Sequence, residues 1–241
     1  DEAERLEGEM EERIQDRKRK ELREAYRAAL RAQVDLRAQA VVFPGPDDLS
    51  RRDRAQVRAL AEPQGQIRQS LNELRLATEE IGQAAVFDYA HRRLDSATGE
   101  AQRALEEARA PDAAREQDRA IALLRGLVEA MEETQRDDED FRRNEAGGGG
   151  GGGSGQQGEQ PLIPDLAELR LLRQMQADLA DRTRRLDESA EQTRAESVEE
   201  LGSEQADLAD LGQALVERLE QQQGQQGAPV QPPDAPQGEQ S

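Results

Sequence analysis

The only histidine of the chain, His91, lies between two acidic residues at helical spacing. Asp88 precedes it by three positions and Asp95 follows it by four, so the three side chains would share one helix face. Imidazole and carboxylate groups placed together in this way are potential metal ligands. The run Asp88-Tyr89-Ala90-His91 also matches the acid-x-x-His pattern of carboxylate-bridged di-iron bundles, but those bundles need the motif twice. We therefore expect no metal or cofactor, and we interpret His91 as a half-exposed residue near a bundle surface.

Pairs of adjacent carboxylates recur along the chain, and any of them could in principle supply an acid and a base. They are Glu11-Glu12, Glu79-Glu80, Glu106-Glu107 and Glu199-Glu200. Catalytic carboxylates need an apolar pocket that shifts their pKa values, and a chain with two tyrosines, three phenylalanines and no tryptophan offers little material for one. A catalytic triad, a phosphate-binding loop and a metal-binding motif are all missing from the sequence. The sequence therefore predicts that the protein is not an enzyme.

The basic cluster Arg17-Lys18-Arg19-Lys20 could contact nucleic acid or an anionic membrane. Eight acidic residues precede it in the same predicted helix, and the net charge of the whole chain is -19. Aromatic residues that could stack on bases do not interleave with it. We therefore expect no nucleic-acid partner, and we favour a head-to-tail helix contact in which an acidic end meets the basic cluster.

The composition favours long helices over a large globular core. Of 241 residues 34% are apolar and 35% are charged, which is typical of coiled coils. Cysteine is absent, which excludes disulfides and thiolate metal sites. No apolar stretch approaches the ~20 residues that span a bilayer, so we predict no transmembrane segment in this chain. Whether a signal peptide or anchor precedes Asp1 stays open.

The first 40 residues are predicted to form one helix with a thin apolar stripe, since apolar residues recur mostly every four positions. They are Leu6, Met10, Ile14, Leu22, Tyr26, Leu30 and Val34. The Phe-Pro-Gly-Pro run at 43–46 ends this helix. A shorter helix follows, with Asp48 or Ser50 as its N-cap and Asp53 at capping-box spacing. Pro63 and Gly65 are predicted to end it.

Heptad spacing then predicts a helix from Ile67 that persists to about Arg109, with a kink at Gly82 or Gly99. The run Ala110-Pro111-Asp112 predicts a turn, because proline is tolerated at an early helical position. The returning helix has the apolar stripe Ile121, Leu124, Val128 and Met131, and it is predicted to end within 136–143. Residues 1–143 are thus predicted to form an antiparallel helical hairpin or bundle, the body.

Seven consecutive glycines, 147–153, mark a flexible linker predicted over 144–163. The tract is no nucleotide-binding loop, because no Lys-Ser/Thr follows it. Residues 164–222 are predicted to form a leucine-patterned amphipathic arm, and residues 223–241 a disordered Gln/Pro-rich tail. The arm is either one helix with a phase slip or a hairpin, for which Gly202-Ser203 offers a turn. Two proline-rich matches in the tail, 229–232 and 233–236, are interpreted as spacer rather than as ligands for a recognition domain.

The hairpin from Val86-Phe87, the Gly/Gln-rich linker, the string PLIPDLAELRLLR at 161–173 and Arg182-Thr183-Arg184-Arg185 resemble a set of uncharacterised bacterial helical proteins. These proteins are predicted to be exported or associated with the cell envelope. The resemblance covers about residues 80–220. It implies no activity, and it favours an envelope location over a cytosolic enzyme.

Taken together, the sequence predicts an elongated all-α protein that acts by coiled-coil-type protein contact, either with a partner or by self-association into a homo-oligomer. The contact candidates are the leucines of the arm, Leu169, Leu172, Leu179, Leu186, Leu208, Leu211 and Leu215. The location expected from the resemblance is the bacterial periplasm or envelope, or secretion, with the cytoplasm left open. The alternative is an acidic, secreted spacer that binds cations such as Ca²⁺ weakly through clustered carboxylates.

Overall fold

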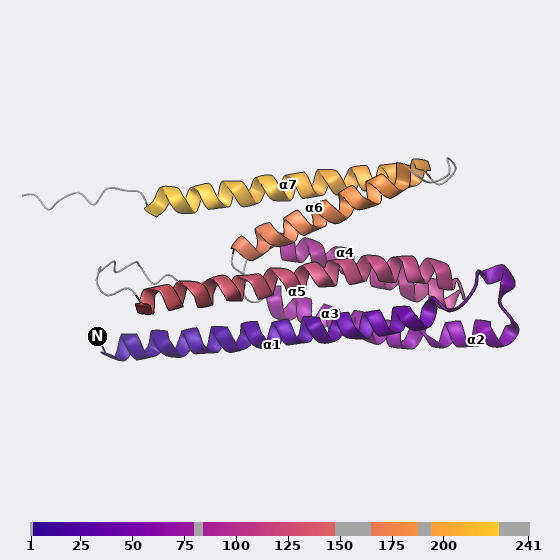
Figure 1. Cartoon of the computed structure of the whole chain (residues 1–241), viewed down its shortest axis with the longest axis horizontal. Coiled ribbons are helices and arrows are strands. Elements are labelled where there is room, and N and C mark those ends of the chain that lie inside the picture. The colour runs from indigo at the N-terminus through magenta and orange to yellow at the C-terminus, as the bar shows by residue number, and fades with distance from the viewer. Residues whose placement is uncertain (1, 80–83, 148–164, 188–193, 227–241) are drawn as a thin grey trace, which may run out of the picture.

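The computed structural model describes residues 2–79, 84–147, 165–187 and 194–226, and these residues form helices and short connections without a strand. The elements are α1 (Glu2–Ala40), the 3-10 turn η1 (Pro46–Asp48), α2 (Arg51–Ala59), α3 (Ala61–Glu79), α4 (Ala85–Glu106), α5 (Ala110–Gly147), α6 (Asp165–Asp187) and α7 (Arg194–Gln226). The predicted all-α class is confirmed. Figure 1 shows the long helices running along a common axis. We call α1 to α5 the body and the pair α6 and α7 the arm.

The ends of the first two helices follow the local signals in the sequence. α1 ends at Ala40, just before the predicted Phe-Pro-Gly-Pro stop. Ser50 is the N-cap of α2: its Oγ accepts the Asp53 N–H at 3.1 Å and donates to Asp53 Oδ2 at 2.6 Å. This reciprocal pair satisfies a backbone donor that the first helical turn cannot satisfy itself. The predicted N-cap is confirmed with Ser50, not Asp48, at the cap, and Asp53 lies at the predicted spacing. Its carboxylate accepts from the Ser50 hydroxyl, so these two bonds make one half of a capping box.

The predicted break at Pro63 and Gly65 is wrong. The break falls at Leu60, and α3 begins at Ala61. Pro63 lies in the first turn of α3, where a backbone N–H has no partner within the helix, so the missing donor costs nothing. Gly65 lies beside α4, and a Cβ there would stand 3.4 Å from the Gln102 side chain.

The prediction of a single helix from Ile67 to about Arg109 is also wrong. α3 ends at Glu79, and Ala84 has non-helical dihedral angles before α4 begins. The two helices pack side by side and run antiparallel, as Arg68 of α3 bonds to Asp95 of α4 at 2.7 Å while Gly65, earlier in α3, faces Gln102, later in α4. The predicted kink site Gly82 lies outside the described residues.

The chain reverses near the predicted turn and Pro111 takes the predicted early helical position, since α5 begins at Ala110 and packs along α4. The turn itself lies at 107–109, before the predicted Ala110-Pro111-Asp112. α4 ends in a Schellman-type cap. Ala108 has φ 60°, and the Arg109 N–H donates to the Ala104 carbonyl at 2.7 Å. α5 extends to Gly147, the first residue of the glycine tract, and so beyond the predicted end at 136–143. The rest of that tract lies outside the described residues.

The main core lies where α1, α3, α4 and α5 meet, and it continues into the arm. Its largest body residues with less than 2% exposure include Tyr26, Phe87, Leu94, Leu124 and Leu127. Each side chain of this size contributes about 1.5–3 kcal/mol when buried. A second, smaller cluster around Val57 and Leu105 packs α2 against the end of α4. This packing agrees with the predicted stripe of α5, whose residues Leu124, Val128 and Met131 are buried.

Three fully buried glutamines join α1, α3 and α5 inside the body. Gln64 Oε1 accepts a hydrogen bond from Gln33 Nε2 at 3.1 Å and another from Gln117 Nε2 at 2.9 Å, while Gln64 Nε2 donates to Gln33 Oε1 at 2.9 Å. A buried amide costs free energy unless it is hydrogen-bonded, so the network favours one alignment of the three helices.

The arm is a hairpin of two antiparallel helices, which settles the choice that the sequence left open. Arg182, late in α6, pairs with Glu204, early in α7, whereas Arg218, late in α7, pairs with Asp165 at the start of α6. The turn is not at Gly202-Ser203, since both residues lie inside α7. The connection falls in 188–193, which lies outside the described residues, as do 148–163 of the predicted linker and 227–241 of the predicted tail. Residues 144–147, predicted as linker, are the end of α5, and residues 223–226, predicted as disordered tail, are the end of α7.

Candidate functional site at the interface of arm and body

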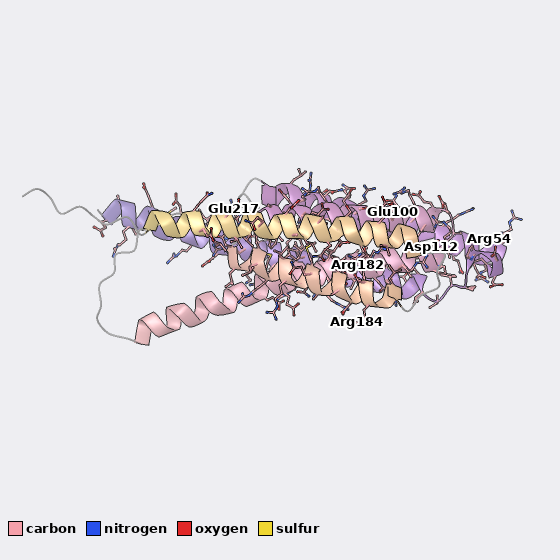
Figure 2. The ribbon with its side chains drawn as sticks, turned by 90° about the horizontal axis from the view of Figure 1, so that it is seen from above. Arg54, Glu100, Asp112, Arg182, Arg184 and Glu217 are labelled. Carbon is pink, nitrogen blue, oxygen red and sulfur yellow. The ribbon has the colours of Figure 1, made fainter. Side chains whose placement is uncertain are left out.

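The predicted contact leucines of the arm are mostly buried within the chain itself. Leu172, Leu179, Leu208 and Leu215 are at most 5% exposed. Leu211 is half-buried against the core, Leu186 is half-buried, and Leu169 is 46% exposed. α6 contacts α4, α5 and α7, and Figure 2 shows α6 and α7 side by side over the body. The surface against which the arm leucines pack is therefore the body together with the paired arm helix.

One glycine of the body allows α6 to approach α5 closely. A Cβ at Gly126 would stand 3.1 Å from Leu171 Cδ1, which is tighter than ordinary van der Waals contact. Leu171 is itself fully buried. Because Gly126 has no side chain, Leu171 of α6 can pack closely against α5 at this position.

Glu168 of α6 caps a helix of the body. Its Oε2 accepts the Val86 N–H at 2.9 Å, and its Oε1 accepts from Arg218 Nη2 at 2.5 Å. Ala84, the N-cap of α4, provides no side-chain cap, so the carboxylate satisfies an N-terminal donor and lies at the positive end of the helix dipole. The side chain is 2% exposed, and its burial raises the pKa of Glu168 despite the opposing effects of Val86 and Arg218.

Glu204 of α7 is the second buried carboxylate of the interface, and two arginines from different helices bind it. Arg93 Nη2 of α4 donates to Glu204 Oε2 at 2.7 Å, and Arg182 Nη2 of α6 lies 2.5 Å from Glu204 Oε1. Burial disfavours the charge on Arg182, but the hydrogen bond and the nearby carboxylates outweigh it and raise the pKa of Arg182. Next to this cluster Tyr89 donates to Asp207 Oδ2 at 3.1 Å, and burial raises the pKa of Tyr89 to about 12.

A groove of about 350 Å³ opens beside Glu204, where α4, α5, α6 and α7 meet. Figure 2 shows three of its residues from above, Glu100, Asp112 and Arg182. Its walls carry five arginines and six acidic residues. Several of these are paired with one another, such as Arg119 with Glu116 at 3.1 Å and Arg115 with Asp112 at 2.5 Å. Because the charges nearly balance, the groove presents no strong field of one sign to a ligand.

His91 lies away from this groove, and its prediction as a half-exposed residue is wrong. It is 2% exposed, and its Nε2 lies 2.7 Å from Tyr26 Oη, so it links α4 to α1 inside the core. Burial, and then the charge of Arg75, lower the pKa of His91 to about 4. Asp95 is bound by Arg68 and Asn72, which lower the pKa of Asp95. Two of the three potential ligands, His91 and Asp95, thus bond to other side chains.

The sequence did not single out Glu168, Glu204 or Arg93. Their types are common in this chain, which has 52 acidic residues and 33 basic ones, so nothing local distinguishes them. Among the described residues no group of three or more histidine and acidic side chains is placed to hold a metal ion. None of the described helices is long and apolar enough to cross a membrane. Comparison of the chain with protein-family models, with curated proteins and with solved structures gave no match.

Proposed function

We propose that the protein is a non-enzymatic interaction protein that binds another protein chain through helix-to-helix contact, in a bacterial cell envelope. The observation that carries this proposal is an exposed apolar stripe on the first half of α1. Leu6 is 50% exposed, Met10 63% and Ile14 46%, within a helix segment that is otherwise almost entirely charged. Contiguous apolar side chains left in water on a charged helix are typical of a docking surface.

The stripe differs from the arm leucines in what it contacts. The arm leucines pack within the chain, whereas the first buried apolar residue of α1 among those described is Leu22, after the stripe has ended. In Figure 1 the first half of α1 runs toward one end of the elongated molecule. We therefore assign the contact with another chain to α1. The role of the arm in this proposal is to stabilise the body, against which it packs. The envelope location rests on the resemblance of residues 80–220.

Photo-crosslinking in the bacterium that makes the protein tests this proposal. A photo-reactive residue in place of Arg13 lies beside the stripe and leaves its three apolar side chains intact, and Met10→Asp then removes the apolar contact. We expect discrete crosslinked products from position 13 that disappear with Met10→Asp. The same residue in place of Glu73, exposed on α3, is the matched control and should give none of these products. Equal products from both positions, or none from position 13, would contradict the proposal.

A further inference from the structure

We propose that the partner of the α1 stripe is a second copy of this chain, bound antiparallel along residues 2–20 of α1. This inference rests on the function proposed above and names its partner. The contact would leave the arm and its interface with the body unchanged, because the stripe contributes no residue to either core cluster.

The stripe has the geometry of a helix-pairing surface. Leu6, Met10 and Ile14 follow one another at steps of four, so their directions fall within about 80° of each other around the helix. Ala3 and Arg17, each seven positions from Met10, lie on the same face, and both are exposed. The face from residue 2 to residue 20 is about 28 Å long, and Met10 lies near its centre.

The charges of this segment favour one orientation of a second copy. Residues 1–12 carry seven acidic side chains and one basic side chain, whereas residues 13–20 carry five basic side chains and one acidic one. A parallel pair would place like charges together along the whole contact. An antiparallel pair centred on Met10 places the acidic part of each copy against the basic part of the other, and Leu6 of one copy beside Ile14 of its partner. The segment is thus complementary to itself when one copy is reversed.

The fold leaves room for this second helix. Figure 2 shows the last turns of α5 diverging from the first turns of α1. Exposure of 46–63% along the stripe shows that helices of the same chain leave it open. A second α1 helix supplies both the apolar stripe and the charge pattern that match it.

Cysteine crosslinking tests the orientation directly, because the chain has no cysteine of its own. Ala3→Cys and Arg17→Cys are made separately in the full chain. Under mild oxidation we expect each variant alone to stay largely uncrosslinked and an equimolar mixture to form a 3-to-17 disulfide dimer. Crosslinks that form within each variant alone and not between the two would show a parallel pair and overturn the proposal.

Sedimentation equilibrium of the full chain tests the association itself. We expect a monomer–dimer equilibrium that weakens as salt is raised, because the charge pairs are exposed. Met10→Asp should weaken it at least tenfold, since it places two carboxylates at the centre of the contact. Leu76→Asp, at an apolar residue of α3 that is 56% exposed, is the control and should not change it. Circular dichroism should show equal helix content in both variants.

Two outcomes separate this inference from the proposed function. A chain that stays monomeric at every concentration and salt, with no 3-to-17 disulfide, overturns the second copy as partner. If position 13 still crosslinks to a different protein in that case, the contact function stands and only the identity of the partner is wrong. If position 13 crosslinks to nothing, both proposals fail.

Discussion

Arg93 of α4 and Glu204 of α7 form an ion pair of 2.7 Å across the interface of body and arm, and the carboxylate is 5% exposed. Arg182 of α6 binds the other oxygen of the same carboxylate. A buried charge that loses its partner is costly, because it can be solvated neither by water nor by protein. The position of the arm on the body therefore depends on this carboxylate.

The first prediction concerns Glu204→Gln. Neutralising the carboxylate removes the nearest counter-charge of both arginines, although Arg182 keeps Asp178 at 3.0 Å and Arg93 keeps Glu200 at 3.7 Å. We expect a loss of about 2 kcal/mol in the free energy of unfolding, since the charged hydrogen bonds to Glu204 are lost. Urea unfolding measures that loss, and hydrogen exchange of α6 and α7 locates it. Glu217→Gln is the matched control on the same helix: Glu217 is exposed (Figure 2), and the change should stay within about 0.5 kcal/mol. Equal effects of the two variants would show that Glu204 does not hold the arm.

The second prediction concerns pH. The pKa of His91 is about 4 in the folded chain against an ordinary value of 6.5, so the unfolded chain binds more protons between these two values. Stability is therefore fully present above pH 6.5 and is lost as the pH falls toward 4, by roughly 3 kcal/mol in total for this group. The unfolding free energy of wild type and of His91→Gln, measured from pH 7 to pH 4, should diverge in this window, with the wild type falling more steeply.

Because His91 is the only histidine, its imidazole signals in an NMR titration can be assigned without ambiguity. They should titrate near pH 4. A titration midpoint near 6.5 would mean that the imidazole is not buried against Tyr26.

The sequence predicts the helical class, the first helix and the early helical position of Pro111 because these depend on local signals, namely apolar spacing and proline. It fails where the same residue types fit two conformations. Pro63 marks a break when read alone, but a proline also fits the first turn of a helix, as in α3. Gly202 suggested a turn, yet it lies inside α7, where the tertiary contacts of the arm outweigh its weak helix propensity.

Sequence patterns do not predict the contacts between arm and body, for a different reason. Glu168 caps a helix that lies 82 positions away in the sequence, and Glu204 binds Arg93 across 111 positions. Carboxylates and guanidinium groups occur everywhere in this chain, so their long-range pairing cannot be read from local spacing. The arm leucines were correctly recognised as an apolar stripe, but only the tertiary packing shows that most of them pack inside the chain.

The third prediction concerns the buried glutamines. Gln64 bonds to both Gln33 and Gln117, so Gln64→Leu leaves two buried amides without their partner. We expect a loss of about 3 kcal/mol in the unfolding free energy, since each buried unsatisfied group costs about 1–3 kcal/mol. Replacing all three residues with leucine should restore much of that stability in thermal unfolding. A single variant as stable as the wild type would show that the network does not form.

The fourth prediction compares two glycines inside helices. Gly202 of α7 has no neighbouring atom within 4 Å of an added Cβ, so Gly202→Ala should raise the unfolding free energy by about 1 kcal/mol through helix propensity alone. Gly126→Ala gains the same propensity, but its Cβ would press on Leu171 at 3.1 Å, and Leu171 is fully buried and has little room to move. Strain of this kind costs about 1–3 kcal/mol.

We therefore expect Gly126→Ala to lower the unfolding free energy or leave it unchanged while it speeds hydrogen exchange in α6. The double variant Gly126→Ala with Leu171→Ala separates strain from propensity. It relieves the overlap, so its stability should exceed the sum of the two single effects. If Gly126→Ala stabilised the protein as much as Gly202→Ala does, Leu171 could not lie against Gly126. The arm would then not pack against α5 at this position.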